Sequence, residues 1–121
     1  MPYKILVIDD EADIREIIEY ILLRNGYTVD TAADGQIAFE KIQTNKPDLI
    51  ISDISMPNCN GYELLKKIST ITPPKIPVLF LSGYTDGHEL HTNSDHNFVG
   101  ILSKPVSSKD LVAAVKNIQL Q

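Results

Sequence analysis

Short apolar runs alternate with amphipathic stretches along nearly the whole chain, and this alternation constrains the fold more than any other feature. The apolar runs have the length of strands and are rich in Ile, Val and Leu; they cover residues 3–8, 28–32, 49–52, 78–81 and 98–102. The amphipathic stretches repeat apolar residues at helical spacing and cover residues 11–25, 35–45, 61–71 and 107–118. Strict alternation of strands and helices predicts an α/β fold, with one five-stranded parallel sheet and helices on both faces.

Charged and hydroxyl side chains stand where four of the apolar runs end. Asp9 and Asp10 follow the first run, Asp53 ends the third, Ser82 closes the fourth and Lys104 comes just after the fifth. The carboxyl ends of parallel strands meet at one edge of a sheet, so we expect these side chains to share that edge. Crowded carboxylates repel one another, which favours a site for a hard divalent cation such as Mg²⁺. A metal, a carboxylate nucleophile, a hydroxyl and an ammonium group together indicate a phosphoryl-transfer site.

The order of these motifs resembles that of a known family. Asp9-Asp10, Asp53-x-x-Met-Pro-x-x-x-Gly61, Ser82-Gly83 and Lys104-Pro105 resemble the CheY-like receiver domain of two-component response regulators, over nearly the whole chain. The resemblance implies a flavodoxin-like (βα)5 three-layer sandwich with strand order 2-1-3-4-5. That order places strands 1 and 3, which carry the three acids, at the switch point where open α/β sheets bind their ligands.

The same resemblance implies a function and a cofactor. In receivers, a sensor histidine kinase or a histidine phosphotransfer domain donates a phosphoryl group from phosphohistidine to the aspartate that matches Asp53. Lys104 would neutralise charge on that group, and Ser82 would hydrogen-bond one of its oxygens after transfer and so switch the conformation. The implied ligands of Mg²⁺ are Asp9 through water, Asp10, Asp53 and the backbone carbonyl of Ser55. Such a phosphorelay acceptor is no conventional enzyme, although it catalyses its own phosphotransfer and autodephosphorylation.

Length and charge narrow the remaining classes of protein. The 121 residues predict a single receiver domain over residues 1–121, without an output domain. Because no apolar run approaches the ~20 residues that span a bilayer, we expect a cytoplasmic protein without membrane insertion. The formal net charge is −5 and Lys and Arg do not cluster, which argues against direct nucleic-acid binding. The downstream protein target is not identified by the sequence.

Four of the candidate site residues also have a purely structural interpretation. Asp9 and Asp10 suit the N-cap and first turn of the following helix. Ser82 suits a turn at a strand end, and Lys104 suits an exposed position ahead of a helix.

Three histidines could suggest structural zinc, but their spacing fits no common zinc signature: His88, His91 and His96.

Three functional alternatives can be compared with the receiver. A phosphatase of the haloacid dehalogenase type also uses an aspartate nucleophile with Mg²⁺, but it needs a second acid at the position of Ser55. A nucleotide-binding Rossmann domain needs a Gly-rich loop after the first strand, and this sequence has none there. The strongest alternative is a phosphorylation-independent receiver-like protein-interaction module. Such modules usually lack one of the acids or the lysine, whereas this chain keeps them all.

Two features depart from the receiver pattern. Family members commonly carry Tyr or Phe three residues before the lysine, a ring that swings inward on activation, and this chain has Ile101 there. Residues 86–97 offer only Leu90 as an apolar anchor beside several poor helix formers. We therefore expect a fourth helix that is short, irregular or mobile, and a signal that leaves the site through reordering of residues 83–97.

Overall fold

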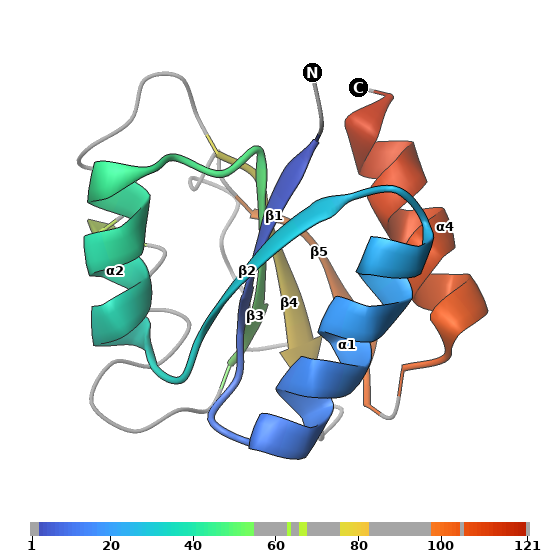
Figure 1. Ribbon diagram of the computed structural model, residues 1–121, viewed down its shortest axis with the longest axis horizontal. Coiled ribbons are helices and arrows are strands. Elements are labelled where there is room, and N and C mark those ends of the chain that lie inside the picture. The colour runs from blue at the N-terminus through green and yellow to red at the C-terminus, as the bar shows by residue number, and fades with distance from the viewer. Residues whose placement is uncertain are drawn as a thin grey trace.

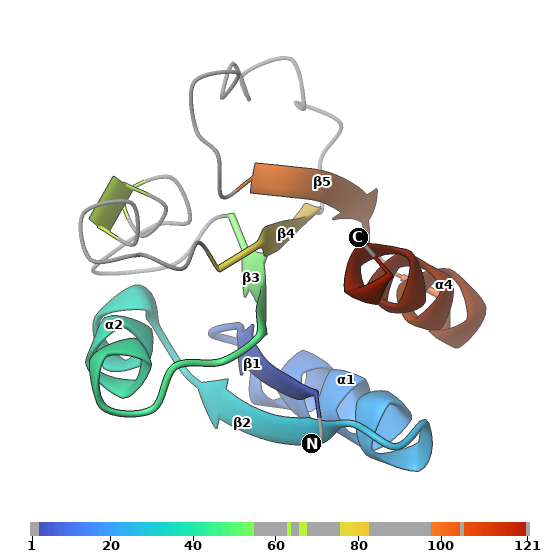
Figure 2. The same cartoon turned by 90° about the horizontal axis from the view of Figure 1, so that it is seen from above.

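The five expected strands form one parallel sheet in this computed structural model, which describes residues 3–54, 63, 66–67, 76–82, 98–104 and 106–120. The strands are β1 (Lys4–Ile8), β2 (Thr28–Ala32), β3 (Leu49–Asp53), β4 (Val78–Ser82) and β5 (Phe98–Ser103). They pair in the order β2-β1-β3-β4-β5 (Figures 1 and 2). The predicted fold class and strand order are confirmed, and the predicted strand limits differ from the observed ones by one residue at most.

Helices cover both faces of the sheet. They are α1 (Ala12–Arg24), α2 (Gly35–Thr44) and α4 (Ser108–Gln119). Figure 2 shows α1 and α4 on one face and α2 on the other, so the chain has the three layers that the sequence predicts. The helix expected over residues 61–71 is described only at Glu63, Lys66 and Lys67, which are helical. The fourth helix, expected near residues 86–96, and the three histidines lie outside the described residues.

Local sequence explains where two of the helices begin and where one ends. The Asp34 side chain accepts a hydrogen bond from the Ile37 amide at 2.9 Å and caps α2, and the Ser107 hydroxyl accepts one from the Asp110 amide at 3.0 Å and caps α4. After α1, Gly26 has a φ of 90°, a left-handed conformation that residues with a Cβ adopt only at a cost. Helix α1 begins differently, because its N-cap residue Glu11 makes no side-chain capping bond.

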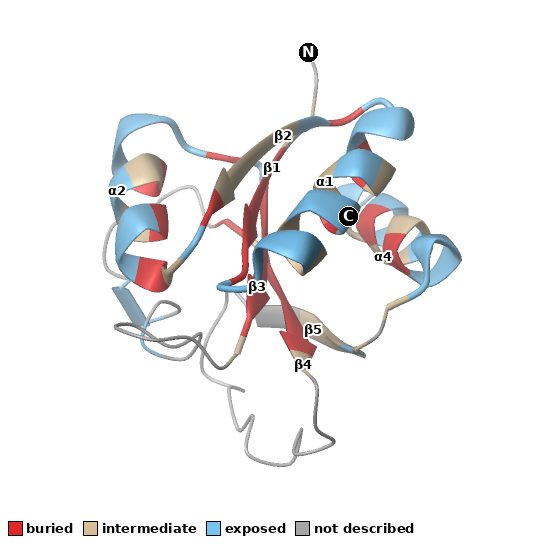
Figure 3. Ribbon diagram, turned by 60° about the horizontal axis from the view of Figure 1, so that its bottom comes forward, coloured by how far each residue is buried: buried red, intermediate tan, exposed pale blue. Residues whose placement is uncertain are grey.

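Alternate residues of the strands belong to two apolar cores, one on each face of the sheet. Figure 3 shows the buried residues along the central strands. On one face, Ile5 and Val7 of β1 pack with buried residues of α1 and α4; on the other, Leu6 and Ile8 pack with buried residues of α2. Strand β3 is buried at all five positions, as expected for a central strand covered on both sides. Burying each large aliphatic side chain stabilises the fold by about 1.5–3 kcal/mol before the entropy cost of ordering it.

The apolar spacing of α1 and α2 includes residues that the fold leaves exposed. Ile18 and Leu22 are buried, whereas Ile17 is 58% exposed in α1 and Ile37 is 40% exposed in α2. Two adjacent apolar residues lie about 100° apart on a helix, so a single sheet face cannot cover both fully.

In the described part of the chain, none of the helices has both the length and the apolar character that crossing a bilayer requires.

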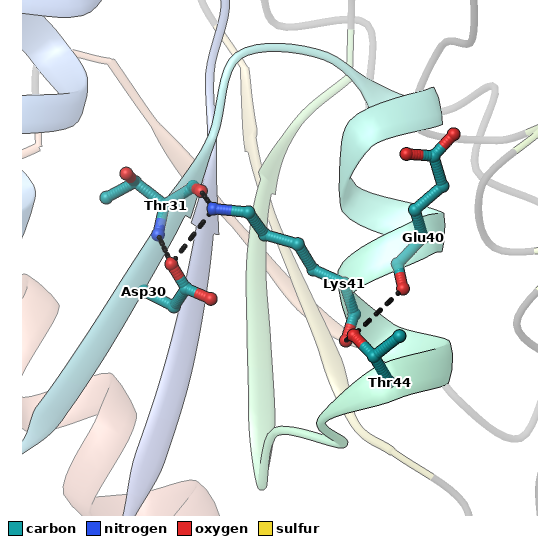
Figure 4. Close-up of polar contacts among 5 residues, drawn as sticks. All are labelled: Asp30, Thr31, Glu40, Lys41 and Thr44. Carbon is teal, nitrogen blue, oxygen red and sulfur yellow. Dashed lines mark hydrogen bonds and ion pairs between the residues drawn. The ribbon is translucent and has the colours of Figure 1, made fainter.

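A polar contact fastens α2 to the edge strand β2 (Figure 4). The Lys41 ammonium group donates to Asp30 Oδ1 at 3.0 Å and to the Thr31 carbonyl at 2.6 Å. Partial burial would raise the pKa of Asp30, but the Lys41 and Thr31 hydrogen bonds and the charges of Lys41 and Lys4 outweigh it and lower that pKa. The contact fixes α2 on the sheet, at the end opposite to its capped N-terminus.

Candidate functional site

Three carboxylates meet at the carboxyl edge of the two central strands. Asp9 and Asp10 follow β1, and Asp53 is the last residue of β3, which is the neighbour of β1 in the sheet. One carboxylate oxygen of each acid lies within 4.8 Å of the others. Asp9 is fully buried, Asp53 is 7% exposed and Asp10 is exposed, so the cluster opens to solvent on the side of Asp10. The structure therefore brings together the three acids that the sequence predicts to converge.

Lys104 lies between two of these carboxylates. Its Nζ is 2.9 Å from Asp9 Oδ2 and 3.2 Å from Asp53 Oδ2. Burial would lower the pKa of Lys104, but the hydrogen bond to Asp9 and the charges of Asp53 and Asp9 prevail and raise it, so the ammonium form is favoured. The interpretation of Lys104 as a solvated lysine is wrong, because its side chain is only 14% exposed and is paired with both acids.

The backbone of the two neighbouring strands aims Lys104 at the cluster. The Lys104 amide donates to the Ser82 carbonyl at 2.7 Å, so the end of β5 is tied to the end of β4. Ser82 is half-buried and pairs in register with Ser103, and the Ile54 amide donates to the Leu81 carbonyl at 3.2 Å. Ser82 therefore ends its strand at the same edge of the sheet as Asp53.

Every polar group of Asp9 makes a hydrogen bond. Its amide donates to the Ala32 carbonyl at 3.2 Å, and its Oδ1 accepts from the Glu11 amide at 2.9 Å. Its backbone carbonyl accepts from Arg15 Nη1 at 2.6 Å, and its Oδ2 accepts from Lys104. The interpretation of Asp9 and Asp10 as the N-cap and first-turn acids of this helix is wrong, since Glu11 occupies the N-cap position and α1 begins at Ala12. Asp9 does satisfy one amide just ahead of the helix.

Arg15 is the contact residue that the sequence did not reveal. It lies in the first turn and a half of α1, where a basic residue is ordinarily a solvated surface group. The only available signal was its long donor side chain six residues after Asp9, on a helix that starts beside the acids. Several predicted positions lie outside the described residues: the Ser55 carbonyl, Met56, Pro57, Gly61, Gly83 and Pro105.

The chemistry of the donor set suits a hard cation. Three carboxylates and one ammonium group carry a formal charge of −2, and all the candidate metal ligands are oxygen atoms. Oxygen ligands are preferred by Mg²⁺ and Ca²⁺, whereas zinc sites usually include His or Cys. The cluster can therefore bind a metal ion and present the buried Asp53 carboxylate beside two cationic groups, the ion and Lys104.

Comparison with known proteins identifies the family. Residues 5–116 match the family model described as the response regulator receiver domain. The chain belongs to the response regulator receiver family. Accepting a phosphoryl group is the role of this family, and histidine kinases are the partners of response regulators in two-component systems. The resemblance predicted from the four motifs is thus confirmed.

Individual receivers match over nearly the whole chain. The chain is 36% identical to the alkaline phosphatase synthesis transcriptional regulatory protein PhoP of Bacillus subtilis, over 98% of this chain and 49% of PhoP. It is also 36% identical to the probable transcriptional regulator ycf29 of Porphyra purpurea, over 98% of this chain and 57% of that protein. The structure of the chemotaxis response regulator CheY4 of Vibrio cholerae superposes with a TM-score of 0.89 at 31% identity, covering 98% of this chain and 99% of CheY4. The chain spans about half the length of the curated relatives it matches.

Proposed function

We propose that Asp53 is the phospho-acceptor of this receiver and that Mg²⁺ is its cofactor. The observation that carries the assignment is the pairing of Asp53 Oδ2 with Lys104 Nζ at 3.2 Å, inside a cluster of three carboxylates at the switch point of the sheet. Asp53 is the only one of the three acids that ends a strand, and its backbone is fixed by pairing with Leu81 of β4. A fixed and largely desolvated carboxylate suits a nucleophile.

The metal would be held by oxygen atoms of four residues: Asp9 through water, Asp10, Asp53 and the backbone carbonyl of Ser55. When bound, Mg²⁺ supplies positive charge that offsets the repulsion between the acceptor carboxylate and the phosphoryl oxygens. The exposure of Asp10 supports this assignment, because Mg²⁺ retains several water molecules and needs an open side.

The residues of the chain divide the remaining work of transfer. An Asp53 oxygen attacks phosphorus in line with the leaving group, the bond between phosphorus and the histidine nitrogen of the donor breaks, and the imidazole departs. Lys104 stabilises the negative charge that spreads over the phosphoryl oxygens in the transition state. Ser82 then donates a hydrogen bond to the phosphorylated product, a contact that differs between the two states and so shifts the conformational equilibrium.

We place this reaction within a two-component pathway. The donor is a sensor histidine kinase or a histidine phosphotransfer domain, the chain catalyses its own phosphotransfer and autodephosphorylation, and the downstream target is a protein. We place the receiver in the cytoplasm, because the ATP that charges the donor histidine is made there. The single-domain organisation predicted for residues 1–121 stays a prediction.

Intact-mass measurement tests the acceptor. With Mg²⁺ and phosphoramidate as a small donor, the wild-type protein should gain the mass of one phosphoryl group, and Asp53→Asn should gain none. Asp13→Asn is the matched control, because it removes an exposed acid from the first turn of α1 and should leave labelling intact.

Two results would contradict the proposal. Persistent labelling of Asp53→Asn would identify another acceptor. Absence of labelling in the wild-type protein, together with a partner protein that binds equally well with and without the phosphodonor, would favour a phosphorylation-independent interaction module.

A further inference from the structure

Helix α1 is tied back to the loop that carries the metal-binding acids. Arg15 Nη1 donates to the backbone carbonyl of Asp9 at 2.6 Å, while the Arg15 amide donates to the Glu11 carbonyl at 3.0 Å as part of the helix. The same side chain therefore spans from the helix to the residue before Asp10. The guanidinium closes a ring of contacts around the turn from β1 to α1.

The start of α1 has no side-chain cap. Helices α2 and α4 each begin with a capping side chain, but Glu11 makes no such bond. The described bonds that hold this turn are those of the Asp9 amide, the Asp9 carboxylate and the Asp9 carbonyl. Of these, only the hydrogen bond to the Asp9 carbonyl comes from a residue inside α1. Arg15 therefore links the orientation of the helix to the position of the acids.

We propose that Arg15 is a positioning residue for the cation site. It fixes the backbone between Asp9 and Glu11 and thereby sets where the exposed Asp10 carboxylate stands relative to Asp53. This inference rests on the proposed Mg²⁺ site. Groups that orient metal ligands from behind commonly change metal affinity when removed, although they never touch the ion.

Geometry favours arginine for this position. The planar guanidinium holds several donors in a fixed fork, so little side-chain freedom remains to be lost when one of them binds a carbonyl. It also places a permanent positive charge behind the acidic cluster, at a carbonyl that is itself an acceptor. Lysine can supply the charge and a single donor, but on a flexible stem that fixes the backbone less well.

Metal binding to four proteins tests the proposal. Mg²⁺ titration, followed by calorimetry or by backbone NMR, should give a dissociation constant about tenfold higher for Arg15→Met than for the wild-type protein. Arg15→Lys should lie between the two. Arg24→Met is the matched control, because it removes the same charge from the far end of the same helix, where Arg24 lies over the Tyr20 ring and donates to the Tyr20 hydroxyl. Its dissociation constant should stay within about twofold of wild type.

A second readout separates positioning from general loss of structure. The Glu11 amide donates to Asp9 Oδ1, so its hydrogen exchange in the metal-free protein should become faster in Arg15→Met, while amides of β3 keep their protection. At saturating Mg²⁺ the rate of labelling of Asp53 should return to near the wild-type value, because Arg15 acts on metal binding and not on the phosphoryl group. If Arg15→Met does not fold, Arg15→Gln is measured against the same expectations.

Each outcome decides between the proposals. An unchanged dissociation constant in Arg15→Met, or an equal increase in Arg15→Met and Arg24→Met, would overturn the role of Arg15 while leaving the metal site in place. Absence of Mg²⁺ binding by the wild-type protein would instead overturn the proposed site itself.

Discussion

Lys104 and Asp9 form an ion pair that joins the end of β5 to the end of β1, with Nζ 2.9 Å from Oδ2. The two strands are not neighbours in the sheet, so the pair bridges across β3 and β4. Because the same Nζ lies 3.2 Å from Asp53, one ammonium group compensates two carboxylates. Asp10 has no part in the described ion pairs, and its carboxylate adds uncompensated negative charge to the cluster.

Asp9 and Asp10 should therefore affect stability in opposite directions. Asp10→Ala should raise the free energy of unfolding of the metal-free protein by about 0.5–2 kcal/mol, because it removes repulsion from a site kept for function. Asp9→Ala should lower it by about 1–3 kcal/mol, because the Glu11 amide and the Lys104 ammonium group each lose a buried acceptor.

Urea denaturation in the presence of a chelator gives both values. Addition of Mg²⁺ should then stabilise the wild-type protein and leave Asp10→Ala unchanged. A loss of stability in Asp10→Ala would show that this acid is part of the structure of the turn.

Lys104 should compete with the metal for the acids. Lys104→Met removes a cation that lies within 3.2 Å of two carboxylates, so we expect Mg²⁺ to bind about tenfold more tightly, equivalent to ~1.4 kcal/mol, while labelling of Asp53 becomes slower. Lys116→Met is the control, because Lys116 lies near Tyr3, at the opposite edge of the sheet. Equal Mg²⁺ affinity in all three proteins would show that Lys104 does not oppose binding of the ion.

Much of the fold follows from residue patterns because strands and helices each bury a periodic face. The continuous apolar run of β3 predicts a strand covered on both sides, and the polar residues at the ends of four of the five strands predict the site. The exposure of Ile17 did not follow, since spacing shows only that a helix is amphipathic and not which of two adjacent residues faces the sheet. The contact between Arg15 and the Asp9 carbonyl did not follow either, because a bond to a backbone oxygen leaves no partner side chain in the sequence.

The contact between Asp30 and Lys41 should make a small contribution to stability that depends on pH (Figure 4). Partial burial would raise the pKa of Asp30, but the hydrogen bonds from Lys41 and Thr31 and the nearby lysine charges lower it from 3.8. The contribution is therefore present above pH 3.8 and is lost as the pH falls through the lower folded-state pKa. Both side chains are 39% exposed, so solvent screening limits the loss in Asp30→Asn at neutral pH to about 1 kcal/mol or less.

Denaturation at several pH values tests this contribution. The difference between wild type and Asp30→Asn should shrink below pH 3.8, and it should be smaller at every pH in a Lys41→Met background. A difference that stays constant down to strongly acidic pH would mean that the amide disturbs β2 for another reason than charge.

Because residue 101 is isoleucine, this position cannot hold an aromatic switch. It pairs in register with Phe80, is half-buried and packs against the core beside α2. A β-branched side chain in a strand has few rotamers to exchange. Ile101→Val should therefore lower stability by no more than about 1 kcal/mol and leave the response to activation unchanged.

Hydrogen exchange with and without beryllofluoride, a mimic of the phosphoryl group, tests where the signal travels instead. Residues 83–97 lie outside those that the structure describes, so the expectation for them rests on their sequence, with Leu90 as the single apolar anchor of residues 86–97. We expect weak protection there that rises on activation, in wild type and in Ile101→Val alike. Strong protection of residues 86–96 that activation leaves unchanged would contradict this, and a response abolished by Ile101→Val would return the switch to β5. This expectation rests on a physical difference: a segment with a single apolar anchor can gain order from a new contact, whereas a β-branched side chain packed in a strand has few rotamers to exchange.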